Sequence, residues 1–363
     1  MPKSFSKYLT SNMTFLKSKT IGFALMAALL YGLSSPFSKL LLQKLPPILM
    51  AALLYLGAGL GMSLVQLLYL TSHKENHEAK LTQKEAPIVI VMILLDILTP
   101  ILLMLGLTLT TASNASLLNN FEIVATSLIA LFLFKENIGK RMWLAILLIT
   151  LSSILLSFTD LSVFSFSIGS VFVVLACIAW GLENNCTRLL SIKDPLQIII
   201  LKGFGSGIGA LIISLLLKET SNNLLYIGMA LLLGCFAYGF SIFFYIKAQR
   251  FLGAARTSAF YAVAPFIGVI VSWIIFHEAI TSRFLGALGI MLIGAYLAAS
   301  EKHKHLHLHP QLKHTHKHSH EDDHHFHHEE EVLGEHLHEH THTPLEHDHP
   351  HTEEIHHAHS HKK

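Results

Sequence analysis

Ten apolar segments, each long enough to cross a bilayer, limit this chain to very few folds. They lie at 21–43, 47–70, 87–107, 113–134, 142–159, 167–188, 195–217, 224–246, 256–276 and 283–300. A membrane-spanning helix needs about 20 mostly apolar residues, because each residue adds about 1.5 Å. Only 14% of the residues are charged, whereas soluble domains carry about 25%. The sequence therefore predicts an all-α integral membrane protein with ten transmembrane helices.

The distribution of Lys and Arg predicts how these spans are oriented. With the N-terminus inside, the outer loops hold only Lys44, Lys218 and Arg283, and the other basic residues of the loops fall on the cytoplasmic side. Cytoplasmic loops are enriched in Lys and Arg. We therefore expect a multi-pass protein of a bacterial-type inner (plasma) membrane, with both termini in the cytoplasm. The first apolar run is too long for a signal peptide, so residues 1–20 form a cytoplasmic N-terminal segment.

The chain also matches itself at a spacing of 142–149 residues. "LFLFKENIGKRMWLAILLI" at 131–149 aligns with "WIIFHEAITSRFLGALGIM" at 273–291, and "LLYGLSSPFSK" at 29–39 aligns with "IAWGLENNCTR" at 178–188. Each half, 21–160 and 166–300, contains five spans. Because five is odd, the second half enters the membrane from the opposite side. Inverted repeats of this kind are typical of secondary transporters, which bind their substrate near the midplane between the halves.

These motifs resemble the EamA family of the drug/metabolite transporter superfamily. The resemblance covers about residues 20–300 and includes "TTASNASLL" and "GAARTSAF" at the starts of the fourth and ninth spans. It implies a permease that moves a small metabolite, and it leaves the substrate open. One departure concerns a proline that the family often has in these two spans. Pro265 supplies it in the second half, whereas Glu122 is followed by Ile123 in the first.

Ionisable residues within spans are candidates for the substrate pathway, because each costs roughly 2.5–3.5 kcal/mol at a helix centre. Glu183 in "WGLENNCTR" and Lys202 in "IILKGFGSGIG" lie at similar depth on neighbouring antiparallel spans. We expect them to pair along the cytoplasmic half of the pathway, where they bind a zwitterionic or anionic solute or relay a proton. The alternatives are a purely structural ion pair, or a Lys202 side chain that extends to the interface.

Further polar residues accompany this pair. Asp96 precedes Pro100 by four residues, a spacing that frees a backbone carbonyl. On a continuous helix, Glu122 and Asn119 share one face. Asn184 and Tyr261 complete the expected substrate pathway. Core packing is the alternative for Tyr261.

Other residues are expected to serve the structure. Gly57 and Gly61, like Gly203 and Gly207, have the spacing of a GxxxG motif. Small residues let helices pack closely, so we expect contacts between the halves or, as an alternative, a homodimer. Glu136 and Glu278 lie at span boundaries, where a carboxylate stabilises the first turn of a following helix.

Residues 301–363 form a tail of different composition. All but three of the 26 histidines lie beyond Glu301, interspersed with Glu and Asp. Imidazole and carboxylate groups together suit Zn²⁺, Ni²⁺, Co²⁺ or Cu²⁺, whereas the low apolar content predicts disorder. We expect a cytoplasmic metal-binding tail with many exchanging sites; a pH sensor or passive buffer is the alternative. The candidate ligands are His303, His305, His307, His309, His314, His316, His318, His320, His324, His325, His327 and His328.

The sequence thus favours one function over two others. It predicts a secondary transporter, working by alternating access, that exports a small polar or amino-acid-like solute. The alternatives are a nickel, cobalt or zinc efflux permease whose tail collects or senses metal, and a sensor or scaffold. No nucleophile motif or phosphate-binding loop is present outside the apolar spans, so we expect no enzyme, no catalytic residues and no required cofactor. The expected partners are membrane lipid, the solute and metal ions on the tail, and not nucleic acid.

Overall fold

The structure is a computed structural model of the 363-residue chain. It describes residues 20–71, 79–134, 138–160, 165–190, 193–252, 257, 260–300, 303–309, 312–318, 336–342 and 345–351.

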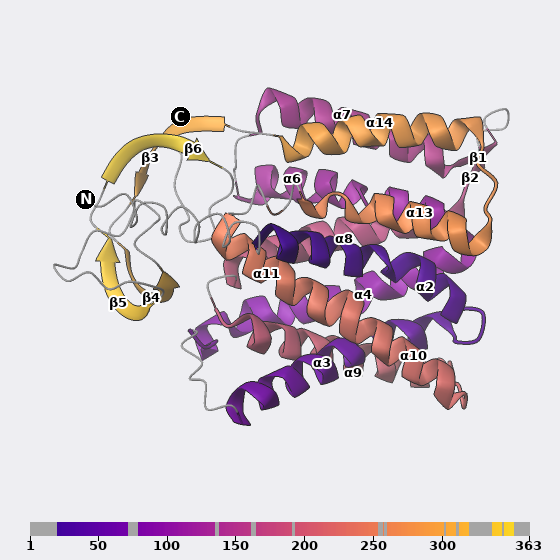
Figure 1. Ribbon diagram of the computed structural model, residues 1–363, viewed down its shortest axis with the longest axis horizontal. Helices are drawn as coiled ribbons and strands as arrows, with labels where there is room; N and C mark the ends of the chain where they lie inside the picture. Colours follow the sequence, from indigo (N-terminus) through magenta and orange to yellow (C-terminus); the bar gives the residue numbers. More distant parts are fainter. Residues whose placement is uncertain are drawn as a thin grey trace, which may run out of the picture.

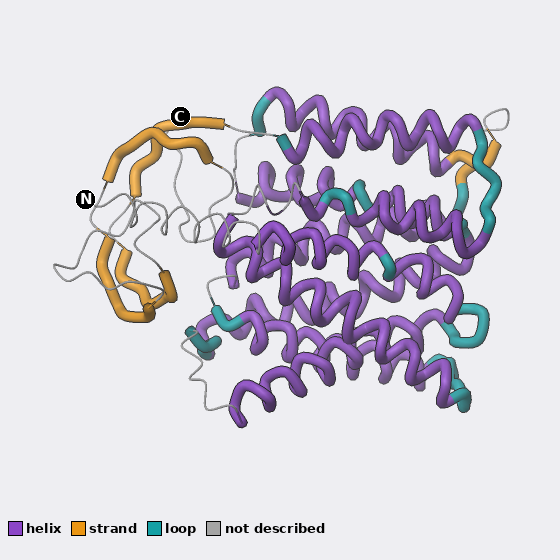
Figure 2. Tube along the Cα trace, in the orientation of Figure 1, coloured by secondary structure: helices purple, strands orange, loops and turns teal. Residues whose placement is uncertain are grey.

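Within these residues the molecule is a bundle of long helices (Figures 1 and 2). The first half contains the helical segment Thr20–Leu41 with α2 (Ser34–Leu41), then α3 (Pro47–Thr71), the short η1 (Gln83–Glu85), α4 (Ala86–Leu109), α5 (Ala112–Leu118), α6 (Phe121–Phe134) and α7 (Lys140–Ser157). The second half contains α8 (Ile168–Leu190), α9 (Pro195–Leu216), α10 (Leu224–Gly234), the π-helical η2 (Cys235–Phe240), α11 (Ser241–Leu252), α13 (Ala264–Phe276) and α14 (Ser282–Ala299).

The expected all-α membrane fold is confirmed. Nine of the described helical segments are long and apolar enough to cross a membrane. The shorter apolar helix Ala264–Phe276 occupies the position of the ninth expected span. Large apolar side chains remain exposed on the outside of the bundle, among them Phe132, Leu216 and Ile274. An apolar exterior with internally satisfied helical backbone is what a lipid environment requires.

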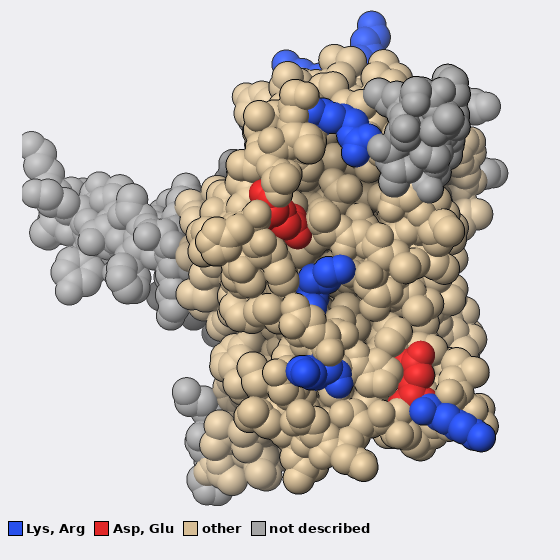
Figure 3. Space-filling model, turned by 90° about the vertical axis from the view of Figure 1, so that its right-hand side faces the viewer, with Lys and Arg blue, Asp and Glu red and all other residues tan. Residues whose placement is uncertain are grey.

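A short antiparallel hairpin of β1 (Phe158–Asp160) and β2 (Ser165–Phe166) joins the two halves. It lies at one end of the bundle, on the right in Figure 1, which we call the hairpin end. The opposite end, where α14 ends at Ala299, is the tail end. Successive spans run in opposite directions, so α3, α5, α8, α10 and α14 all begin at the hairpin end. Figure 3 views the hairpin end, where charged residues form separate small patches on a mostly uncharged surface.

Counterpart spans of the two halves pack against each other. α3 lies against α9, α5 against α13, and α7 against α14; the last pair runs side by side at the top of Figure 1. These helices are the second, fourth and fifth spans of their halves, each in contact with its own equivalent. Such self-paired contacts are the arrangement that an inverted repeat produces around a pseudo-two-fold axis.

One of these pairs, the fourth and ninth spans, is interrupted at equivalent places. In the fourth span a turn at Asn119 and Asn120 separates α5 from α6, and in the ninth a turn at Ala262 and Val263 precedes α13. The two turns are 143 residues apart, within the spacing of the sequence repeat. Discontinuous spans in transporters expose backbone groups and polar side chains at the substrate site. The interruptions therefore mark the region between the halves where a site is expected.

The predicted packing glycines all lie where helices of different halves approach. A Cβ on Gly207 would come within 2.7 Å of the backbone nitrogen of Leu56. Cβ atoms on Gly57, Gly61 and Gly203 would collide with Leu231, Cys235 and Gly59, respectively. A side chain at Gly57, Gly203 or Gly207 therefore forces α3 away from α9 or α10, whereas one at Gly61 requires the Cys235 side chain of η2 to move. The contacts described are within one chain, and a homodimer stays a prediction.

Four segments of the tail are described as short strands. They are β3 (His303–His309), β4 (Leu312–His318), β5 (His336–His342) and β6 (Leu345–His351). β3 pairs with β6 and β4 with β5, in both cases antiparallel (Figure 1). His320, His324, His325, His327 and His328 lie outside the described residues.

Candidate functional site

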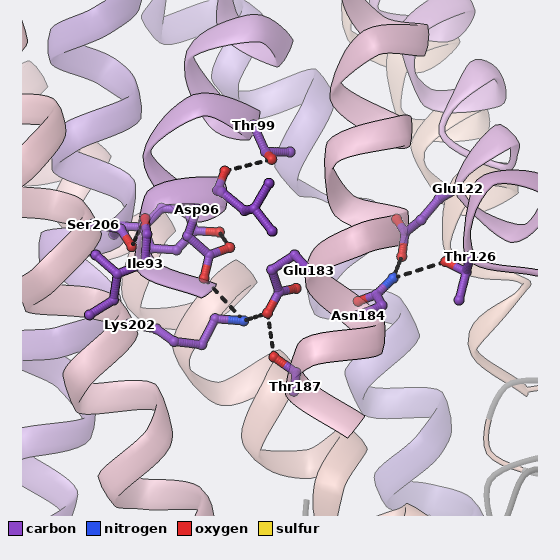
Figure 4. A network of polar contacts seen from close by, with 12 residues as sticks. Ile93, Asp96, Thr99, Glu122, Thr126, Glu183, Asn184, Thr187, Lys202 and Ser206 are labelled. Carbon is purple, nitrogen blue, oxygen red and sulfur yellow. Dashed lines mark hydrogen bonds and ion pairs between the residues drawn. The ribbon is translucent and has the colours of Figure 1, made fainter. Parts of the chain in front are cut away.

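Three ionisable side chains meet in the interior of the bundle. Lys202 on α9 places its Nζ 2.6 Å from Glu183 Oε1 on α8 and 3.3 Å from Asp96 Oδ2 on α4 (Figure 4). All three residues are at most 5% exposed. We call Asp96, Glu183 and Lys202 the charge triad. It joins α4 of the first half to α8 and α9 of the second.

Hydroxyl groups hold both carboxylates of the charge triad. Tyr55 Oη donates to Asp96 Oδ1 at 2.7 Å, and the Thr187 hydroxyl donates to Glu183 Oε1. Tyr55 comes from α3, so four helices contribute to one polar network. Hydrogen bonds of this kind are what make an ion pair tolerable in a medium of low dielectric constant.

The charges of the triad do not balance. Two carboxylates share one ammonium group, which leaves a net charge of −1 when all three groups are ionised. Removing one member of a buried pair costs about 3–5 kcal/mol, because the remaining charge loses its compensation. The triad is therefore sensitive to the arrival of another charge, whether a proton or a charged group of a solute.

A second polar cluster lies on the other side of α8. Glu122 of α6 accepts a hydrogen bond of 2.6 Å from the side-chain amide of Asn184, and the same amide lies 3.4 Å from Thr126 Oγ1 (Figure 4). Asn184 follows Glu183 directly in the sequence, so α8 carries one member of each cluster. Unlike the triad, Glu122, Asn184 and Thr126 are only partly buried. Within the described residues the carboxylate of Glu122 is held by a neutral amide.

Aromatic rings from both halves gather beside these clusters. Tyr31 lies 6.3 Å from Trp180 and 5.5 Å from Tyr261, measured between ring centroids. Tyr31 and Trp180 are repeat equivalents, and they meet across the interface between the halves. Tyr261 also contacts Tyr245, with the centroids 4.9 Å apart. Rings in this arrangement present π faces that favour aromatic or cationic solute groups.

The π-helical segment η2 brings one more ring into this group. Tyr238 lies 6.3 Å from Tyr31 and 5.4 Å from Tyr55, and its Oη is 3.3 Å from the hydroxyl oxygen of Ser34. A π-helical turn widens the helix locally and is frequent at functional sites. Tyr238 thereby links the aromatic rings to Tyr55 and so to the charge triad.

Asn119 and Glu122 flank the turn between α5 and α6, where the backbone N–H of Glu122 donates to the carbonyl of Asn119 at 3.1 Å. Their side chains have different partners: Asn119 Nδ2 lies 3.4 Å from Ser35 Oγ, whereas Glu122 accepts from Asn184. Within the described residues the Oδ1 atoms of Asn119 and Asn120 are buried and lack a hydrogen-bond partner, as does Ser116 Oγ. Buried polar atoms are normally satisfied, so the interruption of the fourth span offers unused acceptors.

Backbone contacts close the hairpin end between the halves. Glu278, in the loop before α14, accepts hydrogen bonds from the backbone N–H groups of Ala112 (2.9 Å) and Ser113 (3.1 Å) at the start of α5. Glu219, in the loop before α10, accepts a bond of 2.8 Å from the N–H of Ile48 at the start of α3. From the sequence we expected the carboxylate of Glu278 to stabilise the first turn of α14, the helix that follows it. Thr281 caps α14 instead, and Glu278 binds a helix of the other half.

The tail end is closed by other contacts. The N–H of Asp194 donates to the carbonyl of Ala79 at 2.9 Å, and the N–H of Leu81 donates to Gln197 Oε1 at 2.8 Å. Lys193 lies 3.2 Å from Glu85. These bonds join the loop before α4 to the loop before α9, which again belong to different halves. The charge triad and the Glu122 cluster thus lie between two sets of contacts that connect the halves.

The sequence alone did not indicate several groups that the structure places here. Tyr55, Tyr238 and Thr187 were not expected, because tyrosines and threonines are common in apolar spans and carry no distinctive spacing. The only feature of the sequence that marked Tyr31 and Trp180 was their equivalent position in the internal repeat. Arrangement in space, rather than residue type, identifies these five as part of the site.

The fold and this site define a class, that of membrane transporters built from two inverted repeats. The family model of the EamA-like transporter family matches residues 18–158 and 167–300. An uncharacterized transporter from Methanothermobacter thermautotrophicus is 30% identical over 288 residues, covering 75% of this chain and 83% of that protein. This chain belongs to the EamA-like transporter family, as the sequence motifs predicted. A solved crystal structure with 15% identity and a TM-score of 0.54, covering 77% of this chain and 96% of that one, has a similar fold.

Proposed function

We propose that this EamA-like transporter is a secondary transporter that exports a small polar metabolite or amino-acid-like solute across the inner membrane by alternating access. The observation that carries the proposal is the position of the charge triad and the Glu122 cluster between the halves, each with members from both. Ionisable groups in spans are costly and mark solute or ion pathways. Inverted repeats bind their substrate at this interface.

The groups present favour a zwitterion of moderate size. Glu122 is partly exposed and has a neutral partner, so it offers a carboxylate to a solute ammonium group. The unused amide oxygens of Asn119 and Asn120 add acceptors nearby. Tyr31 and Tyr261 supply ring surfaces for an apolar or aromatic side chain. In this proposal the charge triad stabilises the site and responds to the solute's charge.

The contacts at the two ends provide the gates that alternating access requires. Opening the hairpin end needs the release of Glu278 and Glu219 from the helix starts that they bind. Opening the tail end needs the separation of the two loops joined at Asp194 and Leu81. Both sets connect the halves, so a rocking motion of one half against the other breaks one set while it preserves the other.

Divalent-metal efflux, with the tail as collector or sensor, is the second candidate. The composition of the tail favours it, because imidazole and carboxylate suit nickel, cobalt and zinc. The charge triad does not favour it, because the carboxylates of Asp96 and Glu183 are already engaged by the ammonium group of Lys202, which a metal ion would have to displace.

Three further features belong to the proposal. Both termini lie in the cytoplasm, in agreement with the distribution of Lys and Arg. The tail binds Zn²⁺, Ni²⁺, Co²⁺ or Cu²⁺ and is dispensable for solute movement. The protein catalyses no reaction and requires no cofactor.

Flux in proteoliposomes tests the two candidates against each other. The full chain and a chain truncated after residue 300 are each reconstituted and offered a mixture of labelled amino acids, and separately Ni²⁺, Co²⁺ or Zn²⁺. We expect both chains to move a solute from the mixture. If neither chain moves an amino acid or another metabolite, and the full chain carries one of the metals, solute export is wrong and divalent-metal efflux takes its place.

A further inference from the structure

A cavity of about 400 Å³ lies at the hairpin end, the face seen in Figure 3. The first half contributes the ends of α2 and α4 and the start of α5 to its walls, and the second half contributes the residues just before α8 and at the start of α14. Leu109 in its wall is 13 residues along α4 from Asp96, or about 20 Å of helix, so the cavity is separate from the charge triad. The polar residues of its lining include Lys39, Thr110, Thr111, Asn114, Ser167 and Arg283.

The charged groups in this lining are cations. Among the described residues that line the cavity, Lys39 and Arg283 are basic and none is acidic. The ammonium group of Lys39 donates to the carbonyl of Leu107 and, at 2.8 Å, to that of Thr110. Both acceptors are neutral, so they fix the position of the ammonium group without cancelling its charge. A cation held in this way is a preorganised partner for an anionic group, and charge-assisted hydrogen bonds are the strong ones.

The cavity borders the contact that closes the hairpin end. Glu278 interacts electrostatically with Lys39, but its carboxylate oxygens accept hydrogen bonds from the N–H groups of Ala112 and Ser113. These are the two residues that follow Thr111, which lines the cavity. Release of the Glu278 contact therefore changes the wall of the cavity at the moment when this end opens.

The internal repeat has a basic residue at both of the positions that line the cavity. In the alignment of the halves, Lys39 matches Arg188 and Arg283 matches Arg141. Inversion places the first member of each match at the hairpin end and the second at the tail end. Loops on the outer side are depleted in Lys and Arg, and in the proposed orientation the hairpin end is the outer one. Basic residues retained there serve a purpose other than orienting the chain.

We propose that the hairpin-end cavity binds the carboxylate group of the exported solute, with Lys39 and Arg283 as its cationic partners and neighbouring hydroxyl and amide groups as further donors. The proposal rests on the solute export proposed above and adds a second binding site to it. Glu122 offers a carboxylate to the ammonium group of the solute, and the charge triad has an excess of negative charge. A zwitterion therefore finds its cationic end favoured in the interior and its anionic end favoured at the hairpin end.

Charged thiol reagents test the cavity without relying on flux. The three native cysteines are replaced by Ala. Ser167→Cys then provides a reporter in the cavity wall, and Asn222→Cys provides a reference in an exposed loop at the same end. Full-length proteins in detergent at low ionic strength react with a sulfonate-bearing or a trimethylammonium-bearing methanethiosulfonate. The ratio of the anionic to the cationic rate in the reporter is divided by the ratio in the reference.

Two lysine variants are compared in the Ser167→Cys background. Lys39→Gln removes the charge but retains a donor for the carbonyls at the end of α4, and the melting temperature of the variant shows whether that structural role is preserved. Lys44→Gln is the matched control, because Lys44 is exposed at the same end and lies outside the lining. The rates are measured again in the presence of an amino-acid mixture, and of the corresponding amino-acid amides, which lack the carboxylate.

A carboxylate site predicts a preference for the anionic reagent. Lys39→Gln should reduce this preference about threefold or more, since one charge at about 7 Å has this effect even at the dielectric constant of water, and Lys44→Gln should not change it. Amino acids should slow the reaction and their amides should not. Equal rates for the two reagents, or equal effects of the acids and the amides, would overturn the site. Protection by amino acids in a protein that shows no exchange in liposomes would support the site and overturn solute export.

Discussion

Glu183 and Lys202 form an ion pair of 2.6 Å between two consecutive helices of the second half. Lys202 also lies 3.3 Å from Asp96 of the first half, so one ammonium group holds two carboxylates and joins the halves. This relationship makes Lys202 the member of the charge triad whose loss leaves most charge uncompensated.

Replacing Lys202 by Met is expected to destabilise the protein more than any single neutralisation of its partners. The variant leaves two buried carboxylates without a cation, and breaking a buried pair costs about 3–5 kcal/mol. Asp96→Asn and Glu183→Gln each leave one pair intact. Melting temperatures from thermal unfolding of the purified proteins in detergent rank the three variants by stability.

The triple variant K202M/D96N/E183Q provides the control for this prediction. It has no buried charge in the triad, so most of the stability lost in K202M should return. A triple variant as unstable as K202M would show that packing of the Lys202 side chain, rather than charge compensation, accounts for the loss.

Glu122→Gln is expected to impair flux without changing stability. Glutamine retains an oxygen that accepts the hydrogen bond from Asn184 but lacks the charge offered to a solute ammonium group. A hydrogen bond to a charged group contributes about 1.5–3 kcal/mol, so flux should fall by about tenfold or more. The matched control, Thr126→Val, alters the weaker contact of the same amide at 3.4 Å and should transport normally. Equal flux in both variants would place Glu122 outside the solute site.

The hairpin-end contacts predict a local change in amide hydrogen exchange. Glu278→Ala removes the acceptor of the Ala112 and Ser113 amides, so exchange should accelerate at the start of α5. Glu219→Ala should accelerate exchange at Ile48 instead, at the start of α3. Mass spectrometry of peptides from the two regions separates these effects. An unchanged rate at α5 in the Glu278 variant would contradict its role in closing this end.

The glycine contacts predict which small residues tolerate a methyl group. Gly203→Ala places a Cβ against the backbone of Gly59 and 2.9 Å from the carbonyl of Tyr55, whereas a Cβ at Gly289 meets nothing within 4 Å. Overpacking costs typically about 1–3 kcal/mol, so Gly203→Ala should lower the melting temperature. The control Gly289→Ala should leave it unchanged. Similar melting temperatures in the two variants would contradict the close approach of α3 and α9.

Much of the fold could be predicted from the sequence, because apolar length and internal repetition depend on the order of residues alone. The all-α membrane fold followed from these two features, and the family from the resemblance of the sequence motifs. The pairing of Glu183 with Lys202 also followed, since a short loop fixes the relative depth of neighbouring antiparallel spans. The participation of Asp96 in the charge triad did not follow, because the rotation of α4 about its axis is set by packing against α8 and α9.

Other differences have local causes. Asn119 and Glu122 were expected to act together; their backbones bond each other across the turn between α5 and α6, but their side chains bind Ser35 and Asn184, respectively. Glu278 was expected to serve α14 and binds α5 instead, since contacts between the halves carry no signal in sequence spacing.

The flux of Glu183→Gln tests most directly whether solute movement depends on the charge triad. The variant, the unaltered protein and Lys140→Gln, which neutralises an exposed lysine at the start of α7, are reconstituted in equal amounts, and exchange of a labelled amino-acid mixture is followed over time. Size-exclusion profiles establish that all three are folded. We predict loss of exchange in Glu183→Gln and normal exchange in Lys140→Gln. Normal exchange in Glu183→Gln would contradict the proposal that the triad belongs to the transport pathway.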